Sequence, residues 1–305
     1  MTLPVPHCTP ELLRSHDFCA RVTRRQARNF YYGLRLLPEP KRSAMFALYA
    51  WMRRADDLVD SSPTCSPEQR KKNLEQFRLL THAHTRPGAP PVTSDGWAGW
   101  PAFAQCVAHF NVPLQLLDDM IDGQQRDLLP VQMNSFEDLQ HYCYQVAGVV
   151  GVASIYIWGF SGESKAQAMA IDRGLAFQLT NILRDLYEDL KQKRMYLPQR
   201  EFDYFHVRPA DVLDRRRSTQ FKDFILWQVQ RADEYYRRSA GLDQLVSEDS
   251  RAALDTMTAI YQGILRKIER DPFRVLRGRV RLGAISKARI AWRALRMGRR
   301  RPKAR

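Results

Sequence analysis

The chain has 305 residues, of which 44% are hydrophobic, and this share excludes a generally disordered protein because it suffices for a large core. Its five cysteines are odd in number and form no CxxC pair, which argues against a disulfide framework or a zinc site and favours a reducing cytosol. The formal net charge of +15 predicts an anionic partner: nucleic acid, membrane lipid or a phosphorylated substrate.

The predicted elements are almost all helices. The chain begins without a charged segment followed by an apolar run, so we expect no signal peptide. Capping sequences mark helix starts at TPE (9–11), SPE (66–68) and SFED (135–138), and the last of these opens an apolar helix through Val150. Apolar residues at helical spacing also extend over 41–60, 162–190, 218–240 and 247–270. We predict about eight to ten helices and an all-α fold.

Two stretches bear on the domain organisation and the membrane. Residues 85–101 are rich in Pro and Gly, and because similar helical sequence lies on both sides, we interpret them as a surface loop within a single domain of residues 1–305. The longest weakly polar run, residues 146–160, is shorter than the roughly 20 residues of a spanning helix. We therefore expect a buried helix in a soluble or peripheral protein.

The C-terminal segment, residues 273–305, holds thirteen Lys or Arg and no acid. Such a segment is either a solvated face with a frayed tail or a contact for lipid or nucleic acid. Apolar residues at Ile285, Ile290, Trp292 and Leu295 keep helical spacing, so a basic amphipathic helix is a plausible form for it.

An acidic stripe occupies one predicted helix, in the sequence YAWMRRADDLVD (49–60). Tyr49, Arg53, Asp56 and Asp60 are spaced so that they share one helix face, and most of their neighbours are apolar. A polar stripe among apolar residues indicates carboxylates that face an internal cavity.

A second stripe of the same geometry follows in QLTNILRDLYED (178–189). It contains Gln178, Asn181, Asp185 and Asp189. Two buried carboxylates need a cation, and oxygen ligands without His or Cys favour Mg²⁺ that shares its coordination with substrate phosphates over zinc or iron. Two such stripes predict two helices that face each other across a cavity and hold Mg²⁺ against a diphosphate.

At these residues the sequence resembles the squalene/phytoene synthase family of head-to-head prenyl transferases. The resemblance spans about residues 24–287 and includes NFYYGLRLLP (29–38), YAWMRRADDLVD (49–60), YQVAGVVG (144–151), FQLTNILRDLYED (177–189) and RMYLP (194–198). It implies an isoprenoid synthase fold, a single bundle of helices around a central cavity. It also implies the reaction, in which one allylic diphosphate ionises and is attacked by the double bond of a second, giving a cyclopropyl diphosphate that can ionise and rearrange further.

The resemblance also implies roles for particular residues. The implied ligands of two or three Mg²⁺ ions are Asp56, Asp60, Asp185 and Asp189. The implied catalytic residues are Arg53 and Arg184, which would hold diphosphate oxygens, and Tyr49, Tyr144 and Tyr261, which would stabilise a carbocation or simply pack as aromatics. The implied substrate-binding residues are Gln178, Asn181 and Asn29, the last in place of family serines and next to Arg28. Asp127 matches a family acid, and the glycines of 146–160 would serve either close helix packing or a cavity for a polyprenyl tail.

Several functional alternatives stay open. The motif wording is most similar to bacterial hopanoid-pathway enzymes, which favours two farnesyl diphosphates and presqualene diphosphate or squalene as product; the alternative is phytoene from two geranylgeranyl diphosphates. Other readings are a terpene cyclase or elongating synthase, a non-catalytic scaffold, and a nucleic-acid-binding protein, for which no motif is present. Without a GxGxxG motif we predict no NADPH site. We expect a cytoplasmic enzyme, peripheral on the inner face of an anionic membrane, and leave its oligomeric state open.

Overall fold

The computed structural model describes residues 9–27, 29–60, 65–86, 95–128 and 131–300, with side chains up to residue 294. In these ranges the chain forms fifteen α-helices, a π-helical turn (η1), a 3-10 helix (η2) and no β-strand, which confirms the all-α prediction. The elements are α1 (Pro10–Gln26), α2 (Phe30–Leu34), α3 (Lys41–Val59), α4 (Pro67–Thr85), α5 (Trp100–Phe110), α6 (Leu114–Arg126), α7 (Phe136–Cys143), η1 (Tyr144–Gly148), α8 (Val149–Trp158), α9 (Glu163–Lys191), α10 (Gln199–Tyr204), α11 (Pro209–Leu213), α12 (Thr219–Arg238), α13 (Leu242–Leu245), α14 (Glu248–Arg270), η2 (Pro272–Arg277) and α15 (Ala284–Arg300).

The three predicted capping sequences all start helices. Thr9 Oγ1 accepts a hydrogen bond from the Leu12 amide at 3.2 Å, and Ser66 Oγ accepts one from the Gln69 amide at 3.2 Å. Ser135 and Asp138 form a capping box at the start of α7. The predicted number of helices was wrong, because α2, α10, α11 and α13 have only four to six residues and are too short to show a helical period.

The helix that begins at Ser135 is not regular through Val150. It widens into the π-helical turn η1 and then continues as α8. A π-turn adds a residue to the turn, so side chains beyond it do not follow the α-helical spacing of those before it. Tyr142, in the last turn of α7, and Tyr144, the first residue of η1, are two residues apart and therefore point to different faces of the helix.

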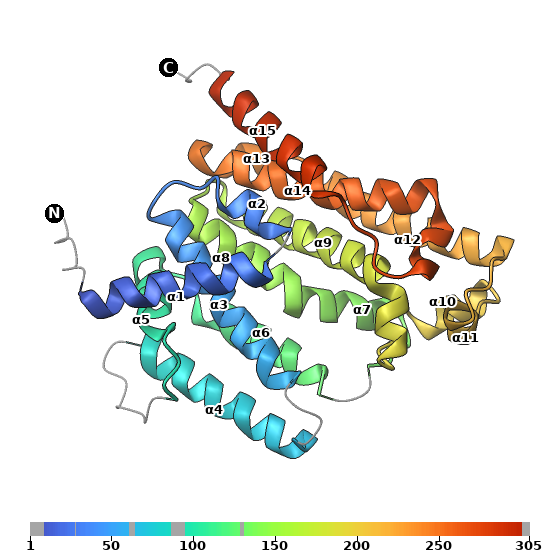
Figure 1. Cartoon of the computed structure of the whole chain (residues 1–305), viewed down its shortest axis with the longest axis horizontal. Helices are drawn as coiled ribbons and strands as arrows, with labels where there is room; N and C mark the ends of the chain where they lie inside the picture. Colours follow the sequence, from blue (N-terminus) through green and yellow to red (C-terminus); the bar gives the residue numbers. More distant parts are fainter. Residues whose placement is uncertain (1–8, 28, 61–64, 87–94, 129–130, 301–305) are drawn as a thin grey trace.

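The longest helix, α9, has 29 residues and runs through the middle of the bundle (Figure 1). It packs against α8, η1, α12 and α14, while α3 packs against α1, α5 and α8. Close approach of α8 and η1 to α9 depends on glycine: a Cβ on Gly151 would lie 2.4 Å from the Ala170 carbonyl oxygen, and one on Gly174 would lie 2.3 Å from that of Ala147. Gly151 and Gly174 therefore allow close helix packing, and both also line the apolar hollow described below, so neither of the two expected roles is excluded.

The remaining sequence predictions concern the loop, the apolar run and the C-terminus. The predicted loop of 85–101 lies between α4 and α5, and residues 87–94 of this loop fall outside the described ranges. Helix α5 begins at Trp100, so the loop ends earlier than predicted. Most of the apolar run 146–160 is buried in α8, as expected. Throughout the described part of the chain, no helix is both long and apolar enough to cross a bilayer. The basic segment forms α15, which packs on α14 and α2 and extends toward the C-terminus (Figure 1).

Candidate active site

Two hollows adjoin between α3, α6, α8 and α9, one polar and one apolar. The polar hollow has a volume of about 350 Å³ and the apolar hollow about 140 Å³. Four residues, Met52, Val146, Gln178 and Asn181, belong to the walls of both. The predicted substrate-binding residues Gln178 and Asn181 therefore lie at the junction, where Asn181 Nδ2 donates a hydrogen bond to Gln178 Oε1 at 3.2 Å.

All four predicted metal ligands line the polar hollow. Asp56 lies in the last turn of α3 and Asp60 is the C-cap residue of that helix, while Asp185 and Asp189 lie one turn apart on α9. Asp127, the C-cap residue of α6, adds a fifth carboxylate to the same wall. The structure thus brings the acids of both stripes to one pocket, as expected, and adds Asp127 from a third helix, which the stripes did not predict.

Two of these carboxylates carry arginine partners. Arg194 Nη2 lies 2.7 Å from Asp60 Oδ1, which links the end of α3 to the segment that follows α9. Asp185 is held by two guanidinium groups, that of Arg184 at 2.6 Å and that of Arg279 at 2.9 Å. The charges of Asp60 and Asp185 are therefore balanced by the protein itself.

The other two predicted ligands are less well balanced. The pKa of Asp56 and that of Asp189 are each raised to about 7, mainly because the pocket walls bury the carboxyl groups. For Asp56 the positive charge of Arg53 opposes this effect, and for Asp189 the negative charge of Asp185 adds to it. The Asp56 side chain is nevertheless 38% exposed, because it faces an open pocket. A cation bound here would stabilise both ionised forms.

Asp127 is held by two tyrosines that the sequence reasoning missed. Tyr142 and Tyr196 donate hydrogen bonds to its carboxylate at 3.0 and 3.2 Å, and their rings stack with centroids 5.1 Å apart. Burial raises the pKa of Asp127 to about 6, and the tyrosine hydroxyls partly oppose that shift. Tyr196 and Arg194 both belong to the RMYLP motif, so that motif was the available sign of their role.

This donor set fits Mg²⁺. All the side chains in question offer carboxylate oxygens, and the arginine nearest to Asp56, Arg53, lies 3.9 Å away, farther than the arginines that pair with Asp60 and Asp185. Among the described residues, no three His, Cys, Asp or Glu side chains are close enough to hold an ion together. An ion would therefore take one or two carboxylates and complete its coordination with phosphate oxygens and water, as Mg²⁺ does in phosphate-transferring sites. The predicted number of two or three ions stays a prediction.

Two predicted catalytic residues do not line either hollow. The Arg53 guanidinium pairs with Asp57 on the same helix and lies 3.9 Å from Asp56, which does line the polar hollow. The Tyr144 hydroxyl donates a hydrogen bond to Asp119 at 3.2 Å, and its side chain lines a separate, outer hollow between α7 and α9. Tyr142, two residues earlier and before the π-turn, occupies the acidic pocket instead.

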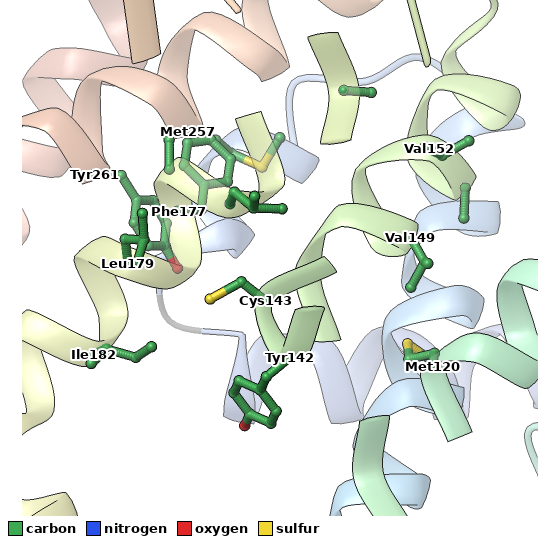
Figure 2. Packing of buried hydrophobic residues seen from close by; sticks show 14 of the residues in the cluster. Met120, Tyr142, Cys143, Val149, Val152, Phe177, Leu179, Ile182, Met257 and Tyr261 are labelled. Carbon is green, nitrogen blue, oxygen red and sulfur yellow. The ribbon is translucent and has the colours of Figure 1, made fainter. Parts of the chain in front are cut away.

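The other predicted catalytic residues lie in or next to the hollows. Tyr49 lines the apolar hollow, and burial raises its pKa. Tyr261 is buried behind the wall, where its ring stacks on Phe177 at 4.6 Å (Figure 2) and its hydroxyl is hydrogen-bonded with Arg184 and Asn181. Arg184 itself lines the polar hollow.

The N-terminal phosphate contact is only partly described. Asn29 lies at the start of α2, immediately before Phe30, which lines the apolar hollow; Asn29 belongs to the wall of neither hollow. Arg28 lies outside the described residues. The apolar hollow is otherwise walled by side chains of α3, α8, α9 and α14, among them Met45, Leu48, Leu254 and Met257.

Comparison with known proteins identifies related sequences. The model of the squalene/phytoene synthase family matches residues 23–286. A 15-cis-phytoene synthase of Synechococcus elongatus is 34% identical over 88% of this chain and 88% of its own length, and a phytoene synthase of Arthrospira platensis is 32% identical over 87% of each.

Solved structures show the same fold. A dehydrosqualene synthase in complex with a ligand superposes with a TM-score of 0.81 at 25% identity, covering 93% of this chain and 96% of that chain. A squalene synthase from Alicyclobacillus acidocaldarius superposes with a TM-score of 0.74 at 23% identity, covering 85% and 94%. The predicted isoprenoid synthase fold is therefore confirmed.

Proposed function

Because this chain belongs to the squalene/phytoene synthase family and is therefore a prenyltransferase that joins two prenyl diphosphates head to head, we propose that it converts two geranylgeranyl diphosphates into phytoene. The observation that supports this substrate is the 32–34% identity to proteins named phytoene synthases over most of the chain. The squalene synthase structure, at 23% identity, bears on the fold alone.

A second candidate retains the substrate that the motifs favoured. The wording of NFYYGLRLLP and QLTNILRD is most similar to the hopanoid branch, which would join two farnesyl diphosphates to presqualene diphosphate or squalene. The relatives weigh against it, so we place it behind the phytoene reaction. Phytoene formation needs no reductant, which agrees with the expectation of no NADPH site.

The polar hollow is the place for the diphosphates. Arg194 and Arg279, now paired with Asp60 and Asp185, supply donors that can turn to phosphate oxygens. Mg²⁺, which the family uses in general, would be held by the four acids of the two stripes, Asp56, Asp60, Asp185 and Asp189, and when bound would neutralise diphosphate charge and make it a better leaving group. The protein thus gathers positive charge where negative charge develops as the C–O bond of the first substrate breaks.

The apolar hollow is the place for a prenyl tail. Its walls exclude water, which would otherwise capture the allylic cation. Gln178 and Asn181 lie where the two hollows meet, so the reacting carbon would be near their side chains, with the Tyr49 ring on the apolar side. Attack by the double bond of the second substrate and loss of a proton give the cyclopropyl diphosphate; its ionisation, rearrangement and a second proton loss give phytoene.

We also infer a cytoplasmic location with peripheral membrane contact, because the product is a hydrocarbon that prefers a bilayer to water. The segment that supports this contact is α15, on which Ile285 is 78% exposed and Trp292 is 52% exposed beside basic residues. Other parts of the helix are held by the protein: Ala294 is buried, and Lys287 Nζ lies 5.8 Å from the centre of the Tyr32 ring.

The test of the function is a product assay with the purified protein. It is incubated with Mg²⁺ and either farnesyl or geranylgeranyl diphosphate, with and without NADPH, and the products are identified by mass spectrometry. We expect phytoene from geranylgeranyl diphosphate, unaffected by NADPH. Exclusive use of farnesyl diphosphate would reject the phytoene proposal in favour of the second candidate, and no condensation of either would reject both.

A further inference from the structure

An arginine, Arg173, forms part of the wall of the otherwise apolar hollow. It precedes Asp185 on α9 by twelve residues, which separates them by about 18 Å along the helix axis at 1.5 Å per residue. Trp158, Leu242 and Leu254 line the same hollow and are at most 4% exposed. Arg173 itself is only 7% exposed, so a charged side chain is buried in the part of the hollow away from the acids.

The Arg173 guanidinium is held by three hydrogen bonds to uncharged groups. Its Nε donates to Ser239 Oγ at 2.9 Å, its Nη2 to the Ser239 carbonyl oxygen at 2.7 Å, and its Nη1 to Thr258 Oγ1 at 2.5 Å. Ser239 is the C-cap residue of α12, so the negative end of that helix dipole lies against the positive charge.

Other groups near Arg173 act in both directions on its charge. Burial lowers its pKa, while the acids Asp243 and Asp255 and the Tyr236 hydroxyl favour the charged form. The Tyr236 ring lies 6.0 Å from the guanidinium carbon. The arginine is thus fixed between α9, the end of α12 and α14.

This arrangement makes Arg173 a rigid obstacle for a hydrocarbon chain in the part of the hollow away from the acids, where Ala170, one turn farther along α9, also lines the wall. A prenyl tail that extended past it would have to displace the guanidinium from its three acceptors, and breaking buried hydrogen bonds to a charged group is costly. The aliphatic side chains around it carry no such penalty and can shift to fill or release space. The hydrogen bonds of Arg173, and not the size of its side chain alone, therefore limit how far a longer tail can extend.

We propose that Arg173 determines specificity by setting the longest prenyl tail that the apolar hollow accepts, an inference that rests on the proposed condensation of prenyl diphosphates at this site. Arg173 does not line the polar hollow, where the carboxylates of the two stripes lie and the diphosphates would bind. It therefore acts on the choice of substrate and not on the chemical step.

The test compares the wild type with Arg173→Met, because methionine is unbranched and fills irregular apolar space without a charge. The matched control is Arg238→Met, which removes the same charge from a side chain that is 50% exposed and pairs with Asp172 outside the two adjoining hollows. Each protein is assayed with geranylgeranyl diphosphate and with geranylfarnesyl diphosphate, which is one isoprene unit longer. The readout is the ratio of kcat/KM for the longer to the shorter substrate.

Arg173→Met should raise this ratio about tenfold or more, the range in which apolar pockets discriminate chain length, and Arg238→Met should leave it unchanged. An unchanged ratio in folded Arg173→Met overturns the inference. If circular dichroism shows that Arg173→Met does not fold, Thr258→Val is assayed in its place, because it removes one hydrogen-bond acceptor of Arg173 without changing the side-chain shape. A smaller rise in the kcat/KM ratio of this variant supports the inference, and an unchanged ratio rejects it.

The outcome is separable from that of the proposed function. If the wild type uses only farnesyl diphosphate, the proposed substrate is wrong, and the ratio is taken between geranylgeranyl and farnesyl diphosphate, where the same rise or its absence decides on Arg173. If no condensation occurs, the affinities of unreactive thiolodiphosphate analogues of two tail lengths replace kcat/KM. A length preference that moves in Arg173→Met then supports the inference although the proposed reaction has failed.

Discussion

Replacing Asp189 by Asn is expected to stabilise the metal-free protein above pH 7. Burial and the nearby charge of Asp185 raise the pKa of Asp189 from its ordinary 3.8 to about 7. At 1.36 kcal/mol per pKa unit, ionising Asp189 in the folded protein costs about 4 kcal/mol. Since the pocket is open to water, we expect about half of this, or about 2 kcal/mol, to appear as a gain in the free energy of unfolding of the Asn variant.

The gain depends on pH in a defined direction. Because the pKa of Asp189 is higher in the folded than in the unfolded state, its protonated form stabilises the fold at low pH, and this contribution is lost as the pH rises through 7. Asparagine undergoes no such loss. The stability difference between variant and wild type should therefore be largest at pH 8 and fall to less than half at pH 5.

The assay is thermal unfolding in EDTA at pH 5 and pH 8. A gain of about 2 kcal/mol corresponds to a rise in Tm of about 4 °C for a protein of this size. The control is Asp203→Asn, an exposed acid on α10 that accepts a hydrogen bond from Gln199 at 2.7 Å and lies outside the pocket. Mg²⁺ with inorganic diphosphate should then raise the Tm of the wild type more than that of the Asn variant. Equal melting of the two proteins at pH 8, or the same gap at both pH values, would refute the reasoning.

Three further predictions concern turnover and the membrane. Excess EDTA should abolish condensation, and Asp56→Asn should lower kcat about a hundredfold without unfolding the protein; activity in EDTA would contradict the metal requirement. Tyr144→Phe should lower kcat/KM less than Tyr49→Phe, since only Tyr49 lines one of the two adjoining hollows; a larger loss for Tyr144→Phe would restore its predicted catalytic role. Trp292→Ala should weaken co-sedimentation with phosphatidylglycerol vesicles, whereas Leu79→Ala, exposed on α4, should not; equal binding by wild type and both variants would show that α15 is only a solvated helix.

The acidic pocket was predictable because its residues obey a local rule. Within one helix, spacing alone decides which side chains share a face, so the order of residues is enough to group Asp56 with Asp60 and Asp185 with Asp189. Their meeting across the hollow was expected from the pairing of two similar stripes and from the family resemblance. The junction residues Gln178 and Asn181 followed from the same stripe.

The choice between Tyr142 and Tyr144 was not predictable in this way. Tyr142 and Tyr144 are two residues apart, so their side chains point to different faces of the helix, and the sequence alone does not show which face meets the acidic pocket. As a result the tyrosine named from the resemblance bonds Asp119 outside the pocket, while its neighbour holds Asp127.

Length, composition, capping sequences and two periodic acidic stripes were enough to predict an all-α protein with a carboxylate-lined cavity, because each of these features depends on residues within a few helical turns. The pairing of Asp60 with Arg194 joins residues 134 positions apart, and the bond from Arg173 to Ser239 spans 66 positions. Such contacts depend on how complete helices pack, since a charge can be balanced by any group that the fold brings near. The packing of whole helices therefore decides which acids pair with arginine, which remain for a cation, and where a buried guanidinium lines the apolar hollow.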